Sequence, residues 1–135
     1  MNIRVSAVVL RDARGRILMV RKRGTSMWMN PGGKPEPGES AAECAVREVG
    51  EELDLRLDSS RLLPLGRFAA PAANEAGFTV VADVFDWPDA VPCGLVPTAE
   101  IEETRWVTDD DLDDYTLAPL FRDHIVPAIG SVDAR

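Results

Sequence analysis

The chain has 135 residues, of which 45% are hydrophobic and 28% charged, so we predict a single globular domain over residues 1–135. Its formal net charge of −8 argues against a nucleic-acid polymer as partner, because that affinity rests on clustered Lys and Arg. The sequence has no apolar run of about 18 residues and no signal-peptide pattern, so we expect a cytoplasmic protein with no membrane partner. Two distant cysteines and a single histidine leave little room for a zinc site.

The first part of the chain predicts two strands joined by a turn. β-branched and apolar residues favour a buried strand over residues 3–10. The polar, Gly-terminated stretch 11–15 predicts a hairpin turn, and residues 16–23 then predict a second strand. Residues 24–30 are expected to form a loop that leads into a short strand.

A loop and a helix follow. Residues 31–39 contain three Gly and three Pro, so we predict no regular structure there. Ser40 and Glu43 have the spacing of a capping box, in which each side chain bonds the backbone of the other residue. We therefore predict a helix over residues 41–53.

The second part of the chain predicts more strands than helices. Strands are expected at 61–71, 77–87 and 102–108, a short helix at 109–115 and a longer one at 118–129. Pro127 should end or kink the last helix. Strands and helices mix without strict alternation. We therefore predict an α/β (α+β) fold, with a mixed sheet between helices on both faces.

Three carboxylates gather on one face of the helix predicted at 41–53. Glu48, Glu51 and Glu52 fall within one turn, while apolar residues recur at helical spacing on another face. Such a cluster taken alone is most often a solvated helix face. Hard divalent cations such as Mg²⁺, however, prefer oxygen ligands and commonly use a few carboxylates with substrate phosphates. The residues upstream of the cluster distinguish the two interpretations.

From Gly33 to Leu55 the sequence resembles the box of the Nudix hydrolase family, G-x5-E-x7-R-E-U-x-E-E-x-G-U, in which U is a bulky aliphatic residue. Every fixed position matches except Asp54, where the family usually has glycine. That position falls just past the helix end, where a left-handed conformation often closes a helix, and Asp tolerates that conformation. The resemblance implies an α/β/α sandwich.

The resemblance also implies hydrolysis of a nucleoside diphosphate linked to another group X, with Mg²⁺ or Mn²⁺ as cofactor. By position, Glu48, Glu51, Glu52 and the carbonyl of Gly33 match the family's metal ligands. Bound metal would polarise the phosphoryl oxygens and lower the pKa of a bound water. The general base varies within the family, and our prediction is Glu52 or Glu48.

Three further residues are predicted to support catalysis. Arg47 is expected to orient the glutamates by charge-assisted hydrogen bonds rather than to touch substrate. Glu39 would be a partner of Arg47 outside the metal's own ligands, or an outer metal ligand. Glu100 lies where a loop of the family often supplies one more carboxylate, with Glu103 as the alternative and surface charge as the ordinary explanation.

Four residues are predicted to contact substrate: Arg23, Trp28, Lys34 and Asn74. Arg23 ends a basic strand near the place where family members hold phosphates, although a basic strand end is more often solvated. Trp28 could stack on a base or pack beside the loop. Asn74 could bond the edge of a base. The other tryptophans, Trp87 and Trp106, are assigned to packing.

The leading functional hypothesis is a pyrophosphohydrolase of a (d)NTP, including an oxidised one, that releases a nucleoside monophosphate and pyrophosphate. The alternatives are cleavage of ADP-ribose, a nucleotide sugar or a dinucleoside polyphosphate. A non-catalytic, nucleotide-sensing module of the same fold is the alternative from another class. The expected partner is a small nucleotide, and the chain is expected to be a monomer or homodimer.

Overall fold

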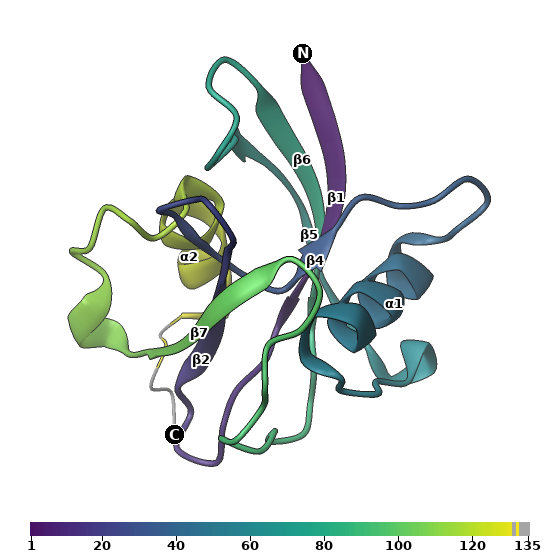
Figure 1. Ribbon diagram of the computed structural model, residues 1–135, viewed down its shortest axis with the longest axis vertical. Coiled ribbons are helices and arrows are strands. Elements are labelled where there is room, and N and C mark those ends of the chain that lie inside the picture. Colours follow the sequence, from purple (N-terminus) through teal and green to yellow (C-terminus); the bar gives the residue numbers. More distant parts are fainter. Residues whose placement is uncertain (131, 133–135) are drawn as a thin grey trace.

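The computed structural model describes residues 1–130 and 132; residues 131 and 133–135 of the predicted domain lie outside this part (Figure 1). The elements follow the predicted order with ends shifted by a few residues. The strands are β1 (Asn2–Val9), β2 (Ile17–Lys22), β3 (Trp28–Met29), β4 (Gly32–Gly33), β5 (Leu63–Pro71), β6 (Thr79–Asp86) and β7 (Ile101–Val107). The helical segments are α1 (Ala41–Leu53), η1 (Ser59–Arg61), η2 (Asp109–Asp111), η3 (Leu120–Ile125) and α2 (Val126–Ile129).

The strands form two sheets. The first has the order β4-β1-β6-β5, in which β1 and β6 run parallel and the other neighbours antiparallel. The second has the order β3-β2-β7 and is antiparallel. The prediction of a mixed sheet is confirmed for the four-stranded sheet. Strands β2, β3 and β7 form a second sheet of their own. The polar turn after β1 connects the two sheets, with a hydrogen bond from the N–H of Leu18 to the carbonyl of Leu10.

Helical segments cover both sides of the strands, on opposite sides of the view in Figure 1. Side chains of successive strand residues point to opposite faces of a sheet. In β1 and the residue after it, Val8 and Leu10 therefore join the core beneath α1, whereas Ala7 and Val9 join a second core with Phe121 of η3. The α/β/α arrangement is confirmed, and α1 holds its acidic face against the β1–β4 edge.

The ends of α1 are those that the sequence predicts. The side chain of Ser40 accepts a hydrogen bond from the N–H of Glu43, and Glu43 accepts one from the N–H of Ser40. At the other end Asp54 adopts the left-handed conformation, with φ 52° and ψ 37°, and donates its N–H to Gly50. Asp54 therefore closes the helix as the family's glycine would.

The stretch 31–39 differs from the prediction at one point. Gly32 and Gly33 form β4 and pair antiparallel with Ala7 and Ser6 of β1, so the prediction of no regular structure there is wrong at these two residues. The absence of side chains is what lets this short strand approach β1 closely.

The C-terminal segments also differ in detail from the prediction. The helix expected at 109–115 is a single 3₁₀ turn, Asp109–Asp111, and the helix expected at 118–129 begins as the π-helix η3 and continues as α2. Pro127 does not end the helix, which continues to Ile129. Pro127 cannot donate a backbone hydrogen bond, and the bonding pattern changes from π to α just before it. None of the helices in the described part of the chain is long and apolar enough to cross a membrane.

Candidate active site

A cavity of about 370 Å³ lies at the edge of the first sheet, beside α1. This volume is within the range of small-molecule sites. Part of its wall is apolar and comes from β1, β6 and the segments near η3: Ile3, Val5, Val80, Ala118 and Leu120. Another part is charged: Lys22, Lys34, Glu48, Glu75 and Glu100. The cavity therefore offers an apolar wall and ionic groups to the same ligand.

The two glycines of β4 allow three elements to meet at this cavity. A Cβ on Gly32, where φ is 152°, would lie 2.0 Å from the carbonyl oxygen of Ser6. A Cβ on Gly33 would lie 1.5 Å from the Oε2 atom of Glu48. A larger residue at position 32 would have to displace the β1 backbone, so close approach requires glycine there, whereas at position 33 it would have to displace the end of the flexible Glu48 side chain.

Glu52 is a buried carboxylate in the last turn of α1. Its side chain is 2% exposed, and its Oε1 atom accepts a hydrogen bond of 3.1 Å from the N–H of Gly32. Its Oε2 atom is buried and finds no hydrogen-bond partner among the described residues. Burial, with a smaller contribution from the charge of Glu48, raises the pKa of Glu52 to about 8. A group bearing positive charge would stabilise the ionised form.

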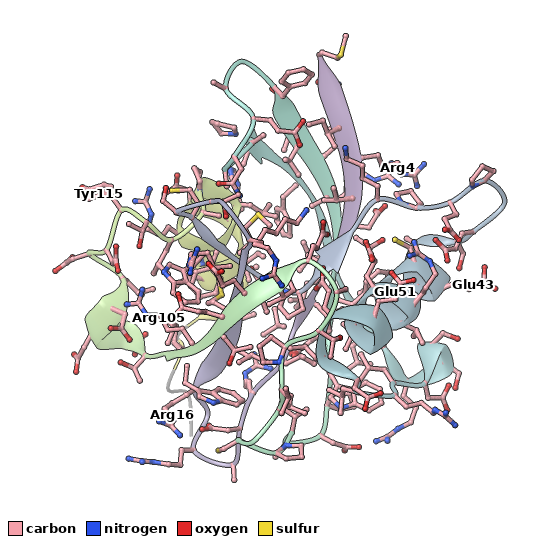
Figure 2. All side chains as sticks on the ribbon, in the orientation of Figure 1. Arg4, Arg16, Glu43, Glu51, Arg105 and Tyr115 are labelled. Carbon is pink, nitrogen blue, oxygen red and sulfur yellow. The ribbon has the colours of Figure 1, made fainter. Side chains whose placement is uncertain are left out.

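Glu48 and Glu51 complete the acidic face. Glu48 lines the cavity, and burial followed by the nearby carboxylate of Glu51 raises its pKa. Glu51 is about half exposed, with 54% of its side-chain surface accessible. Figure 2 shows it further along α1 than Glu43, which lies at the start of the helix. The three glutamates therefore share a helix but differ in burial.

Arg47 connects this acidic face to the loop that precedes α1. Its guanidinium donates to both carboxylate oxygens of Glu39, at 2.7 and 3.0 Å, and to the carbonyl of Lys34 at 3.0 Å. It also donates to Glu48 at 3.4 Å and to Glu51 at 3.2 Å. These contacts lower the pKa of Glu39 to about 2 and raise that of Arg47. The contacts are those of a residue that positions carboxylates.

The donor atoms at this face fit a hard divalent cation. All the possible ligand atoms are oxygens, which Mg²⁺ and Mn²⁺ prefer, and they come from Glu48, Glu51, Glu52 and the carbonyl of Gly33. The Oε2 atom of Glu52, which has no hydrogen-bond partner among the described residues, is available to coordinate a metal. The Gly33 carbonyl otherwise accepts a weak hydrogen bond of 3.4 Å from the thiol of Cys44. Within residues 1–130 and 132, no three acidic, histidine or cysteine side chains are yet gathered tightly enough to hold a metal ion. The chemistry of these oxygen atoms fits such a cation.

The loop before β7 brings Glu100 to the cavity. Its carboxylate lies 3.5 Å from the ammonium of Lys22, and both residues line the cavity. The N–H of Thr98 donates to the backbone carbonyl of Glu52 at 2.8 Å, which ties this loop to the end of α1. Glu103, the alternative to Glu100, pairs instead with Arg21.

The four residues predicted to contact substrate separate into two groups. Lys34 and Asn74 line the cavity. Arg23 does not: it is well exposed and lies 3.9 Å from Glu102. Trp28 also lies outside the cavity wall, with the guanidinium groups of Arg21 and Arg105 at 5.8 and 5.7 Å from its ring centroid.

Lys22 and Asn30 line the cavity but were not among the predicted substrate contacts. For Lys22 a signal was present in the sequence, because residues two apart in a strand share a face. Leu18 and Val20 point to the core beneath α1, so Lys22 continues their face, whereas Arg23 does not. No sequence pattern predicts that Asn30 lines the cavity, since its burial depends on the tertiary structure.

The structure therefore combines an α/β/α fold with an acidic helix that lies beside a two-glycine strand. Comparison with known proteins identifies the family to which this arrangement belongs. The profile of the NUDIX domain family matches residues 1–129. The chain belongs to this family.

Three relatives illustrate the similarity. The chain is 34% identical over 114 residues to the NAD-capped RNA hydrolase NudC of Pseudomonas syringae pv. syringae, covering 82% of this chain and 38% of that protein. It is 28% identical to the CTP pyrophosphohydrolase of Escherichia coli, covering 85% of this chain and 82% of that protein. The crystal structure of the MutT protein from Methanosarcina mazei superposes with a TM-score of 0.79 at 26% identity, over 96% of this chain and 94% of that one. The chain spans only about a third of the length of the first curated relatives it matches.

Proposed function

We propose that this chain is a divalent-metal-dependent pyrophosphohydrolase of a nucleoside diphosphate linked to another group. The observation that carries the proposal is a pair of carboxylates that α1 holds against Gly32 and Gly33 beside a ligand-sized cavity: Glu52, which is buried, and Glu48, whose side chain is 14% exposed. Two largely inaccessible acids with raised pKa values are unfavourable unless a cation offsets their charge. Mg²⁺ or Mn²⁺ is the proposed cation.

In this proposal Glu48, Glu51, Glu52 and the carbonyl of Gly33 hold the metal. The bound ion would neutralise phosphate charge and polarise the phosphoryl oxygens. Glu52 is our first choice of general base and Glu48 the second, because burial places their pKa values nearer to neutral pH than that of an ordinary carboxylate. Arg47 acts on neither water nor substrate; it positions Glu48 and Glu51.

The remaining cavity residues would bind the substrate. Lys22 and Lys34 carry the charge that an anionic phosphate chain requires, and Glu100 orients Lys22 or assists the base. Asn74, on the loop between β5 and β6, faces the same cavity and can bond the nucleoside. Arg23 and Trp28, which lie outside the cavity wall, are left out of the proposed site.

The substrate that we propose is a (d)NTP, an oxidised one included, in which water cleaves the anhydride between the α- and β-phosphates. The products are a nucleoside monophosphate and pyrophosphate. The relative named CTP pyrophosphohydrolase supports this choice, because the match spans most of both chains. NAD-capped RNA is a second candidate, favoured by the relative named for it. The net charge of −8 argues against a long RNA.

A hydrolysis screen with the purified protein tests the proposal. The substrates are the eight common (d)NTPs, 8-oxo-dGTP, ADP-ribose, a dinucleoside polyphosphate and an NAD-capped RNA oligonucleotide, each with Mg²⁺, with Mn²⁺ and with EDTA. Chromatography of the products should show a nucleoside monophosphate and pyrophosphate, and EDTA should abolish the reaction. Nucleotide binding without turnover of any substrate would contradict the proposal and support the sensing module instead.

A further inference from the structure

One residue of the loop before β7 is bonded to the end of α1. An α-helix leaves the carbonyls of its last turn without partners inside the helix. Thr98 supplies partners for two of them. Its N–H donates to the carbonyl of Glu52 at 2.8 Å, and its hydroxyl donates to the carbonyl of Glu51. Thr98 therefore contacts the backbone of both glutamates at once.

Thr98 also begins the turn that carries Glu100. The N–H of Ile101, the first residue of β7, donates to the carbonyl of Thr98 at 3.1 Å and closes a turn over residues 98–101. Ala99, the second residue of this turn, has a positive φ of 54°. A positive φ is unfavourable for alanine, and it persists only where surrounding contacts maintain it. The two hydrogen bonds from Thr98 to α1 are such contacts.

Glu100 is bonded to β2 on its other side. Its backbone carbonyl accepts a hydrogen bond of 2.8 Å from the N–H of Arg23, and its carboxylate lies 3.5 Å from the ammonium of Lys22. The pairing of β2 with β7 shifts register between Arg21 and Lys22, as at a β-bulge. Bulges redirect side chains next to functional sites, and here Lys22 and Glu100 both line the cavity.

Stability of the fold accounts for little of this arrangement. Thr98 and Ala99 are exposed, so water can pair with the same carbonyls when the loop moves away. What the contacts determine is distance, because a single residue separates Thr98 from Glu100. Burial is the main cause of the raised pKa values of Glu48 and Glu52, and the charge of Glu100 adds to it, so these carboxylates lie close enough to interact.

We propose that Thr98 is a positioning residue, which sets the place of the Glu100 carboxylate relative to the acidic end of α1. This inference rests on the proposed function, since it names a residue that acts through a carboxylate of that same site. Without the hydroxyl of Thr98 the turn can relax and carry Glu100 away from Lys22. Such a movement affects the rate, because a displacement of about 1 Å can change it by roughly a hundredfold.

Thr98→Val tests this inference, because valine keeps the shape of the side chain and removes the hydroxyl. With the best nucleotide of the hydrolysis screen, we expect it to lower kcat/KM per folded molecule by roughly tenfold. Thr98→Ser keeps the hydroxyl and should restore most of the activity. Thr116→Val is the matched control, since the Thr116 hydroxyl bonds Asp114 at 2.7 Å and Thr116 does not line the cavity. It should leave kcat/KM unchanged.

A double-mutant cycle with Glu100→Gln separates positioning of Glu100 from general support of the fold. If Thr98 acts through Glu100, Thr98→Val should cause no further loss in the Glu100→Gln protein, within about twofold. An equally large loss in that protein would make Thr98 a support of α1 alone and would overturn the inference. Unchanged kcat/KM in the single variant Thr98→Val would overturn it as well.

Amide hydrogen exchange measured by NMR separates this inference from the proposed function. The N–H of Arg23 is bonded to the carbonyl of Glu100, so its exchange reports the place of Glu100 without any substrate. We expect severalfold faster exchange at Arg23 in Thr98→Val and no change in Thr116→Val. If no compound is hydrolysed but this difference is seen, the proposed function fails and the link from Thr98 to Glu100 stands. If hydrolysis is strong and neither exchange nor rate depends on Thr98, only the inference fails.

Discussion

α1 and η3 cover opposite sides of the strands, yet they bury different chemistry. Toward its strands η3 contributes Phe121 and Ile125, both fully buried and apolar. α1 contributes Val49 and Leu53 in the same way, and with them the carboxylate of Glu52, which is equally inaccessible. An apolar contact stabilises the fold, whereas a buried carboxylate with an unpaired oxygen destabilises it. The η3 side thus buries apolar side chains only, whereas the α1 side also buries a carboxylate that destabilises the fold and that the proposed metal site would explain.

The largest effect should come from the side that serves folding. Phe121→Ala should lower the free energy of unfolding by about 3–5 kcal/mol, because it removes a fully buried ring. Urea unfolding monitored by circular dichroism measures the loss. The rate per folded molecule should be unchanged, because Phe121 packs in the second core and, unlike its neighbour Leu120, does not line the cavity. A fall in that rate would show that the core beside η3 also affects catalysis, which would contradict the comparison.

Glu52→Gln should lower the catalytic rate and leave the stability of the fold almost unchanged. It keeps the shape of the side chain but removes the charge, so we expect at least a hundredfold loss of kcat, about 2.7 kcal/mol, with little loss of stability. Steady-state kinetics of the best substrate measures it. Glu103→Gln is the control, because Glu103 pairs with Arg21 away from the cavity. Full activity of Glu52→Gln would remove Glu52 from the site.

Arg47→Lys tests whether Arg47 positions the carboxylates that would bind the metal. Lys cannot make the two-pronged pair with Glu39, so Glu48 and Glu51 lose part of their orientation. We expect roughly a tenfold loss of activity and a rise in the Mg²⁺ concentration at half-maximal rate. Arg67→Lys, at an exposed pair with Asp83, should change neither. An unchanged Mg²⁺ requirement would argue against a positioning role.

The last effect is a dependence of stability on pH in the metal-free protein. Folding raises the pKa of Glu52 from 4.5 to about 8, so between these values the folded state binds a proton that the unfolded state does not. Stability should therefore fall as pH rises through this window, by up to about 1.4 kcal/mol per pH unit. Unfolding in EDTA at several pH values measures the slope. Glu52→Gln should make the slope less steep and leave the part that Glu48 contributes, and an unchanged slope in that variant would show that Glu52 does not contribute to it.

Local features of the chain could be predicted from the sequence. The capping box at Ser40 and Glu43 and the left-handed Asp54 depend on neighbouring residues only, and both ends of α1 are as predicted. The strands were predicted because runs of β-branched and apolar residues are typical of buried strands, and residues of these runs lie in both cores. The metal ligands remain a prediction, since they rest on the resemblance and on donor chemistry.

Features that depend on distant contacts could not be predicted. The guanidinium groups of Arg21 from β2 and Arg105 from β7 both lie within 6 Å of the Trp28 ring, so the environment of Trp28 depends on a strand pairing that the sequence does not state. The burial of Asn30 and the separation of β2, β3 and β7 into their own sheet have the same origin. The π-helical start of η3 reflects tertiary packing and the proline that follows it, and propensity alone predicts an ordinary helix there.

The hydrogen bond from Thr98 to the last turn of α1 has a consequence for engineering. A second attachment, from the N–H of Val91 to the carbonyl of Arg11, fixes the start of the same connection. Between these two points the chain can change length at low entropic cost, since doubling a flexible loop costs only about 0.6 kcal/mol. Grafted segments of different length could therefore be inserted there while Thr98 keeps the stretch before Glu100 attached to the end of α1.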